Sequence, residues 1–138
     1  MNEEMKLVRK AIEIIEDRKG ENVVVIDLSD VSMPTSYFVI GEADNSVHMK
    51  AIASHFMKSF PIKARHREGL SERRWIVMDY GDFIVHIFHK DARAFYNIES
   101  LWADHIVAIE SLPKDEPEKS AVETADSTDS ATNSAEFS

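Results

Sequence analysis

Six histidines are the residues of this sequence whose type most readily supports metal or acid–base chemistry. His86 and His89 stand three apart near the end of a predicted strand, so their side chains start on opposite faces. His48 and His55 are seven apart in a predicted helix, which separates them by two turns. The other two histidines have no neighbour at a metal-ligand spacing. We therefore expect the histidines to bind no metal.

Asp27 and Asp30 follow the first predicted strand and could hold a divalent ion. Carboxylates at strand ends are more often helix caps or loop hydrogen-bond acceptors, and we favour that interpretation. The four glycines are isolated, so neither GxGxxG nor GxxxxGK(S/T) occurs, and the loop serines lack a GxSxG elbow. We expect no catalytic residue, no metal and no cofactor.

The charge of the chain is uneven. Its 138 residues, 43% hydrophobic and 30% charged, have a formal net charge of −9. From residue 114 onward the charge is −5, and the preceding residues carry −4, with 18 acidic and 14 basic side chains. An acidic domain is a poor candidate for a phosphate-neutralising face, so we expect a protein partner and no direct sequence-specific nucleic-acid binding.

The apolar segments are short. None approaches the roughly 20 residues of a membrane span, and no apolar stretch follows the acidic N-terminus as it would in a signal peptide. The absence of cysteine suits a reducing compartment. These features predict a cytoplasmic protein without a membrane partner.

The elements that must position any site follow from periodicity. Apolar residues at spacings of three and four predict helices over residues 3–19 and 45–60, the second ended by Pro61. A β-branched run over residues 22–28 predicts a strand buried on both faces, and residues 37–41 predict another.

The second half of the chain alternates strands and turns. Residues 63–67 predict a short charged edge strand, and residues 75–79 and 83–88 predict a hairpin. A helix over residues 91–101 and a short strand over 106–109 follow. The order αββαβββα predicts an α/β fold with a mixed, roughly five-stranded sheet flanked by helices. Residues 113–138, rich in Ser, Thr, Asp and Glu, are predicted to be a disordered tail on a folded domain of residues 1–112.

Over half of the twelve aromatic residues lie between Trp75 and Trp102. Along the predicted hairpin, Phe83, Val85 and Ile87 alternate with Ile84, His86 and Phe88, so one face packs inward. If a helix covers the second face too, all of these are core. Otherwise Trp75, Tyr80 and His86 form an exposed patch with a charged rim, which is typical of a protein-binding hot spot. The pattern alone leaves both interpretations open, and the charged rim would consist of Arg74, Asp79, Asp82 and Arg93.

Two long motifs carry a family resemblance. Residues 74–88 resemble the RWxxxDYGDxxVHxF segment of the iojap/ribosomal silencing factor family, and residues 93–102 resemble its RxFYxLExLW ending. Glu68-Gly69 and the helix start Lys50-Ala51-Ile52-Ala53 resemble shorter family motifs. The resemblance covers residues 5–109. Ser36 replaces the usual Asp of the family's SIADYF segment, and no glycine stands in Glu42-Ala43-Asp44-Asn45, where the family commonly has one.

The resemblance implies a fold similar to nucleotidyltransferases but without their activity, since the paired Asp-x-Asp of active enzymes is absent. It implies binding to the fourteenth large-subunit ribosomal protein, which would block joining of the small subunit and silence translation when nutrients are short. It also implies a homodimer when free. Two alternatives remain: an assembly factor acting at the same surface, and a nucleotidyltransferase-like enzyme using Asp27 and Asp30. The predicted partner-binding residues are Glu68, Gly69, Trp75, Asp79, Tyr80, Asp82, His86, Arg93 and Tyr96.

Overall fold

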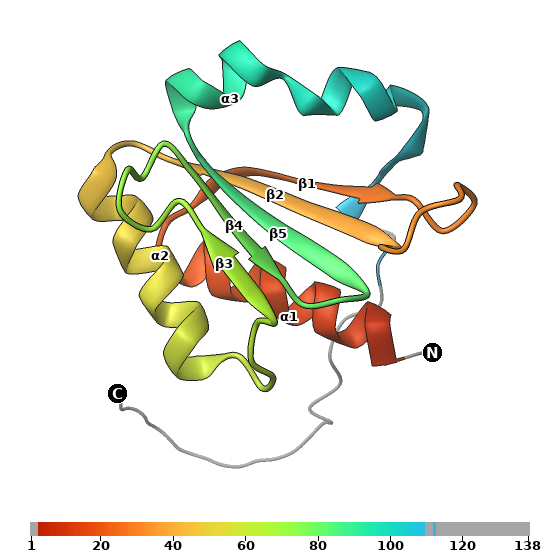
Figure 1. The fold of residues 1–138 in the computed structure, drawn as a ribbon, viewed down its shortest axis with the longest axis horizontal. Coiled ribbons are helices and arrows are strands. Elements are labelled where there is room, and N and C mark those ends of the chain that lie inside the picture. Colours follow the sequence, from red (N-terminus) through yellow and green to blue (C-terminus); the bar gives the residue numbers. More distant parts are fainter. Residues whose placement is uncertain (1–2, 110–111, 113–138) are drawn as a thin grey trace.

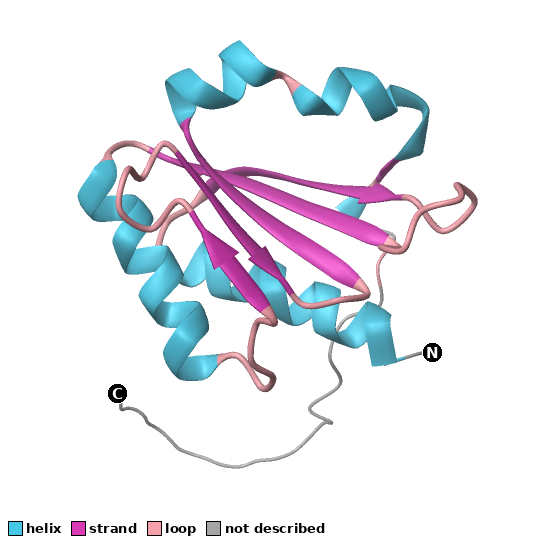
Figure 2. Ribbon diagram, viewed as in Figure 1, coloured by secondary structure: helices cyan, strands magenta, loops and turns pink. Residues whose placement is uncertain are grey.

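The protein, described by a computed structural model over residues 3–109 and Leu112, is built around one open mixed sheet of six strands (Figures 1 and 2). The strand order across the sheet is β3-β4-β5-β2-β1-β6. The predicted tail, residues 113–138, lies outside the described residues. The elements are α1 (Glu3–Asp17), β1 (Glu21–Asp27), β2 (Tyr37–Ala43), α2 (Ser46–Ser59), β3 (His66–Glu68), β4 (Trp75–Asp79), β5 (Phe83–His89), α3 (Lys90–Tyr96), η1 (Ile98–His105) and β6 (Ile106–Val107).

Helices cover the sheet from both sides. α1 and α2 pack on one face, and α3 with the 3-10 helix η1 runs along the other (Figure 1). The strands β2 and β5 pair in parallel, and the other neighbouring strands pair antiparallel. The predicted α/β class with a mixed sheet is confirmed, and the short strand expected after residue 105 is present as β6.

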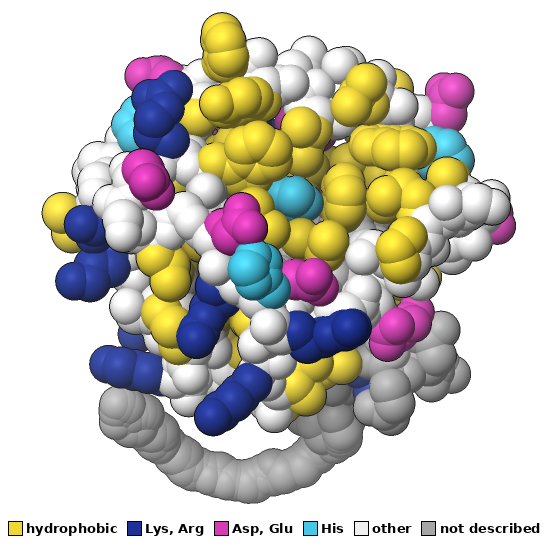
Figure 3. All heavy atoms as spheres, viewed as in Figure 1, with side chains coloured by type: hydrophobic (Ala, Val, Ile, Leu, Met, Phe, Trp, Pro, Cys, Tyr) yellow, Lys and Arg dark blue, Asp and Glu magenta, His cyan; other side chains and the backbone are white. Residues whose placement is uncertain are grey.

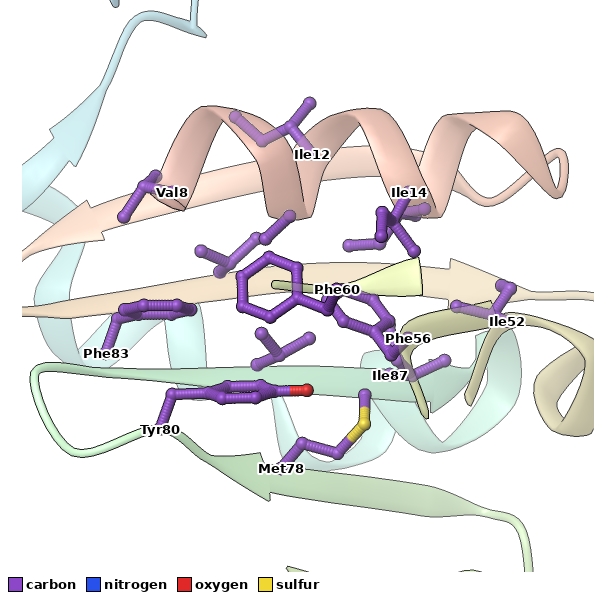
Figure 4. Packing of buried hydrophobic residues seen from close by; sticks show 14 of the residues in the cluster. Val8, Ile12, Ile14, Ile52, Phe56, Phe60, Met78, Tyr80, Phe83 and Ile87 are labelled. Carbon is purple, nitrogen blue, oxygen red and sulfur yellow. The ribbon is translucent and has the colours of Figure 1, made fainter. Parts of the chain in front are cut away.

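The face beneath α1 and α2 holds the main core. α1 places Val8, Ile12 and Ile15 against the sheet, as its apolar spacing predicts. α2 begins at the N-cap Asn45, whose side-chain oxygen accepts a hydrogen bond from the His48 backbone N–H at 2.9 Å. Figure 4 shows aromatic side chains from α2 and from the β4–β5 hairpin pointing toward one another in this layer. Among them are Phe56, Phe60, Tyr80 and Phe83.

The first predicted strand is covered on both faces in its centre. Val25 packs into the main core, and Ile26 packs into a second cluster under α3 and η1. The predicted strand over residues 63–67 instead forms at His66–Glu68. There His66 pairs with Asp79, the last residue of β4. The edge strand therefore begins where β4 offers a pairing partner.

The helical stretch predicted over residues 91–101 is present, but it is divided into two helices. α3 ends at Tyr96 because Asn97 adopts a left-handed conformation (φ 45°, ψ 52°), and its N–H caps the carbonyl of Arg93 at 2.8 Å. Asparagine tolerates this conformation better than most residues, since its short polar side chain can bond locally. The chain then restarts as the 3-10 helix η1.

Candidate interaction surface

The β4–β5 hairpin sends its side chains alternately to the two faces of the sheet. Met78, Phe83 and Val85 enter the main core. Their neighbours Val77, Ile84 and His86 point to the opposite face, where α3 and η1 lie. The question left open by the sequence therefore depends on how much of this second face the two short helices cover.

They cover one half of it. Ile26, Leu28, Ile40 and Phe88 are fully buried beneath α3 and η1, together with Ala92 on the inner side of α3. Figure 3 shows apolar side chains gathered on the sheet beside these helices. We call these side chains the half-covered face: Phe38, Trp75, Val77, Ile84 and His86. His86 is buried, and the other four are half-buried.

Strand register makes the half-covered face continuous. Phe38 on β2 lies opposite Ile84 on β5, and His86 on β5 lies opposite Val77 on β4. Trp75 occupies the next row, where it stacks on Phe88 with ring centroids 4.9 Å apart. The β4–β5 hairpin and the distant strand β2 thus contribute to one apolar surface.

Trp75 and His86 are joined by a hydrogen bond. The indole Nε1–H of Trp75 donates to Nδ1 of His86 at 3.0 Å. The histidine ring is also packed edge-on against Phe38, with centroids 4.6 Å apart. Tyr96 of α3, 47% exposed, lies 4.9 Å from the Trp75 ring. The structure therefore brings together three of the predicted residues: Trp75, His86 and Tyr96.

His86 has a nitrogen without a partner among the described residues. Since Nδ1 accepts from Trp75, a neutral ring carries its proton on Nε2, and that buried N–H has no acceptor. Burial also lowers the pKa of His86 to about 4, so the ring is neutral near pH 7. An unpaired buried donor costs about 1–3 kcal/mol.

Arg93 is not an exposed rim residue but a buried link between helices and strands, which we call the Arg93 clamp. The prediction of an exposed Arg93 is wrong, because the side chain is buried. Its guanidinium donates to Glu99 at 2.7 and 3.1 Å, to Glu42 at 3.1 Å and to the Asn22 carbonyl at 2.5 Å. These bonds tie α3 and η1 to β1 and β2.

Tyr80 does not belong to the surface. The prediction that it shares an exposed patch with Trp75 and His86 is wrong, because it is 8% exposed and packs in the main core. Its ring lies 4.9 Å from Phe60 and 5.2 Å from Phe83, and burial raises its pKa to about 12. Residue 80 follows Asp79 directly, and the alternation of the strand carries it to the other face.

The remaining predicted residues occupy turns and the sheet edge. Gly69 adopts a positive φ of 84°, and a Cβ there would lie 2.0 Å from the Trp75 carbonyl oxygen, so the position requires glycine. Asp79 accepts a hydrogen bond from the Gly81 N–H at 2.8 Å, the turn role expected of it. Glu68 is exposed on β3, 2.7 Å from His66.

Asp82 lies on the far side of the hairpin turn. Its carbonyl accepts from the N–H groups of Ser36 and Tyr37, at 2.7 and 3.3 Å. Burial, followed by the charge of Asp82, raises the pKa of Glu4 in α1. Asp82 is therefore near α1 and separated from the half-covered face.

Phe38 and Ile84 were missed by sequence reasoning, as were the Arg93 partners Glu42 and Glu99. Strand alternation within residues 83–88 places Ile84 beside His86, so that signal was available. Phe38 reaches the surface through the parallel pairing of β2 with β5, which no local pattern reveals. Glu42 lies 51 residues from Arg93 and carried no signal of its own.

Asp27 has the loop role that we favoured. Its Oδ1 accepts from the backbone N–H and the hydroxyl of Ser29, at 2.9 and 2.6 Å. Within residues 3–109 and Leu112, no three His, Asp or Glu side chains gather closely enough to hold a metal ion. In the same part of the chain no helix is long and apolar enough to cross a membrane.

Comparison with known proteins adds the family. Residues 1–137 match the family model described as "Ribosomal silencing factor during starvation". The chain belongs to this family. A relative from Halalkalibacterium halodurans, ribosomal silencing factor RsfS, is 35% identical over 102 residues, which span 72% of the chain and 87% of the relative.

A solved structure and a more distant relative extend the comparison. A crystal structure from Bacillus halodurans superposes with a TM-score of 0.66 and 34% identity, covering 78% of the chain and 99% of that protein. A mouse protein, "Mitochondrial assembly of ribosomal large subunit protein 1", is 26% identical over 117 residues. That match covers 75% of the chain and 51% of the mouse protein.

Proposed function

We propose that the protein binds the large ribosomal subunit through the half-covered face and prevents the small subunit from joining. The single observation that carries the proposal is an apolar surface from three strands, left open by α3 and η1, in a member of the ribosomal silencing factor family. A body docked at the intersubunit side would act by its bulk alone. Translation would then be repressed when nutrients are limiting.

The chemistry of the half-covered face favours a protein partner. Its side chains are apolar or aromatic, apart from His86, whose Nε2–H is buried within the face. An apolar segment of a partner protein would pack against such a surface. The family resemblance makes the fourteenth large-subunit ribosomal protein the proposed partner, and a cytoplasmic location follows from that partner.

The proposed mechanism requires no catalysis. Asp27 is engaged with Ser29, and the sequence contains neither a GxGxxG nor a GxxxxGK(S/T) phosphate-binding loop. The same apolar surface gives the protein a way to self-associate when no ribosome is available. A free homodimer would then be in competition with ribosome binding.

Sedimentation with isolated subunits tests the proposal. Purified protein should co-sediment with large subunits and reduce formation of complete ribosomes from separated subunits. Absence of both effects at micromolar protein would overturn the proposal.

Trp75→Ala provides the matched variant. It should weaken binding to large subunits by about 2 kcal/mol, about 30-fold, because a large aromatic side chain is lost from the proposed contact. Phe95→Ala is the control, since Phe95 is 78% exposed on α3. If Phe95→Ala weakens binding and a folded Trp75→Ala does not, the contact lies on the outer side of α3.

Assembly of the large subunit is the second candidate function. The name of the mouse relative supports it, and it would use the same surface. The two functions differ in the cell: a deletion strain lacking an assembly factor accumulates precursor particles during growth. A strain lacking only a silencing factor keeps normal particles and fails to lower translation on starvation.

A further inference from the structure

The negative charge of the domain conceals a local concentration of positive charge. Between residues 50 and 74 there are seven Lys and Arg side chains and two Glu, a net charge of +5. The rest of residues 1–112 therefore carries −9. We call the seven cations the basic edge: Lys50, Lys58, Lys63, Arg65, Arg67, Arg73 and Arg74.

The fold gathers the basic edge at one side of the molecule. Its residues come from α2, from the connection to β3, from β3 itself and from the loop before β4, and β3 is the outermost strand at its end of the sheet. Figure 3 shows Lys and Arg side chains grouped over α2 and β3. Arg73 is half-buried and the other six are exposed.

These cations are not neutralised within the described part of the chain. There, none of the seven lies within 4.0 Å of a carboxylate, whereas Lys90 pairs with Asp44 at 3.0 Å and Arg93 pairs with two glutamates. Unpaired cations on an edge strand can simply prevent strand addition. That role accounts for Arg67 on β3, but it does not explain the cations on α2 or in the loop before β4.

The basic edge lies one strand away from the half-covered face. β4 supplies Trp75 and Val77 to that face, and its other edge pairs with β3. On β3, Glu68 lies opposite Val77, and the cation Arg67 lies opposite Met78, whose side chain enters the main core. A body held on a ribosomal protein by the half-covered face would therefore bring the basic edge against whatever surrounds that protein. On a ribosomal particle the surroundings are largely RNA phosphate.

We propose that the basic edge binds the phosphate backbone of ribosomal RNA beside the protein contact, without reading base sequence. The proposal rests on the proposed function, since the half-covered face sets the position of the edge. Exposed Lys and Arg side chains on several elements match a repeating array of phosphates, and each contact releases counterions. Binding to large subunits should therefore weaken steeply with salt.

The test is the salt dependence of a charge-neutralised variant. Lys58→Gln, Lys63→Gln and Arg67→Gln are combined in the full chain. Affinity is measured from about 50 to about 200 mM salt for two probes: purified large subunits and an RNA duplex of roughly 16 base pairs. If all three cations contact phosphate, the wild-type protein loses about 40-fold more affinity over this range than the variant.

Two further variants separate charge from structure. Lys58→Arg, Lys63→Arg and Arg67→Lys together keep the charge and should keep the wild-type salt slope. Lys10→Gln, Arg18→Gln and Lys19→Gln remove three positive charges from α1 and the residues after it, and should leave the slope unchanged. Thermal unfolding of each variant verifies that the fold is intact.

An unchanged slope in the charge-neutralised variant overturns the proposal. It is also overturned, in favour of a protein contact, if affinity for large subunits falls at every salt concentration while the RNA duplex does not bind. The two failures are distinguishable. Wild-type protein that does not bind large subunits contradicts the proposed function and, with it, the basic-edge proposal. Binding to large subunits with an unchanged slope in the charge-neutralised variant contradicts only the basic edge.

Discussion

The two faces of the sheet receive side chains of similar type from the same strands, but they are covered differently. On one face α1 and α2, with 15 and 14 residues, bury Met78, Phe83 and Val85. On the other face, the seven-residue helix α3 and the eight-residue 3-10 helix η1 bury only the half of the sheet nearest to them. Apolar residues on this sheet therefore do not by themselves indicate core; the length and position of the covering helices decide.

A matched pair of neighbouring residues should separate the faces most strongly. Phe83→Ala should lower the free energy of unfolding by about 4 kcal/mol, because a fully buried ring is lost from the main core. Ile84→Ala should cost about 1 kcal/mol, since Ile84 is half-exposed on the other face. Urea denaturation measures both values.

Binding reverses this order. Ile84→Ala should weaken association with large subunits, whereas any Phe83→Ala protein that remains folded should bind normally. Equal destabilisation by the two substitutions would show that the second face is as well packed as the first, and the distinction between them would be lost.

The next prediction concerns the Arg93 clamp, because we expect it to hold α3 and η1 over the second face of the sheet. Arg93→Gln leaves the carboxylates of Glu42 and Glu99, both largely buried, without their cation. We expect a loss of about 3 kcal/mol in the free energy of unfolding, with the α3–η1 segment loosened from the sheet. Denaturation and amide hydrogen exchange in residues 90–105 report the two effects.

Lys90→Gln is the control for the clamp. It removes another α3 cation, but one whose pair with Asp44 is exposed, so stability should hardly change. If Arg93→Gln leaves hydrogen exchange in residues 90–105 unaltered, the helices are held over the sheet by apolar packing and the clamp is unnecessary.

Local patterns predicted much of this structure. The hairpin strands begin at Trp75 and Phe83 as expected, because alternation and a three-residue connection are properties of adjacent residues. α2 follows its cap and its proline for the same reason. The two errors inside the predicted surface have different origins. Strand alternation alone puts Tyr80, five positions after Trp75, on the opposite face, so this error could have been avoided from the sequence. The burial of Arg93 could not, because its partners include Asn22 and Glu42, which are distant in sequence.

The basic edge was missed because the charge was averaged over the whole domain. The overall charge of the domain predicted no phosphate-binding face, and the average over residues 1–112 is indeed negative. The edge arises because α2, β3 and the loop before β4 are adjacent both in sequence and in space. A count over residues 50–74 would have revealed it without the structure.

The smallest expected difference in stability between the two faces comes from His86, and it depends on pH. Burial lowers the pKa of His86 from 6.5 to about 4, so the unfolded chain binds a proton that the folded chain rejects between these values. The stability from neutral His86 is complete above pH 6.5 and is lost as the pH falls toward 4. At pH 5 the loss amounts to about 2 kcal/mol.

His86→Gln isolates that contribution, because glutamine can still accept from Trp75 but does not titrate. We expect the variant to be less stable than the wild type at pH 7, and the gap between the two free energies of unfolding should shrink by about 2 kcal/mol at pH 5. Urea denaturation at both pH values gives the comparison, with the exposed His66→Gln as control. A gap that stays constant would mean that the His86 ring can be protonated in the fold, so that water already reaches its Nε2.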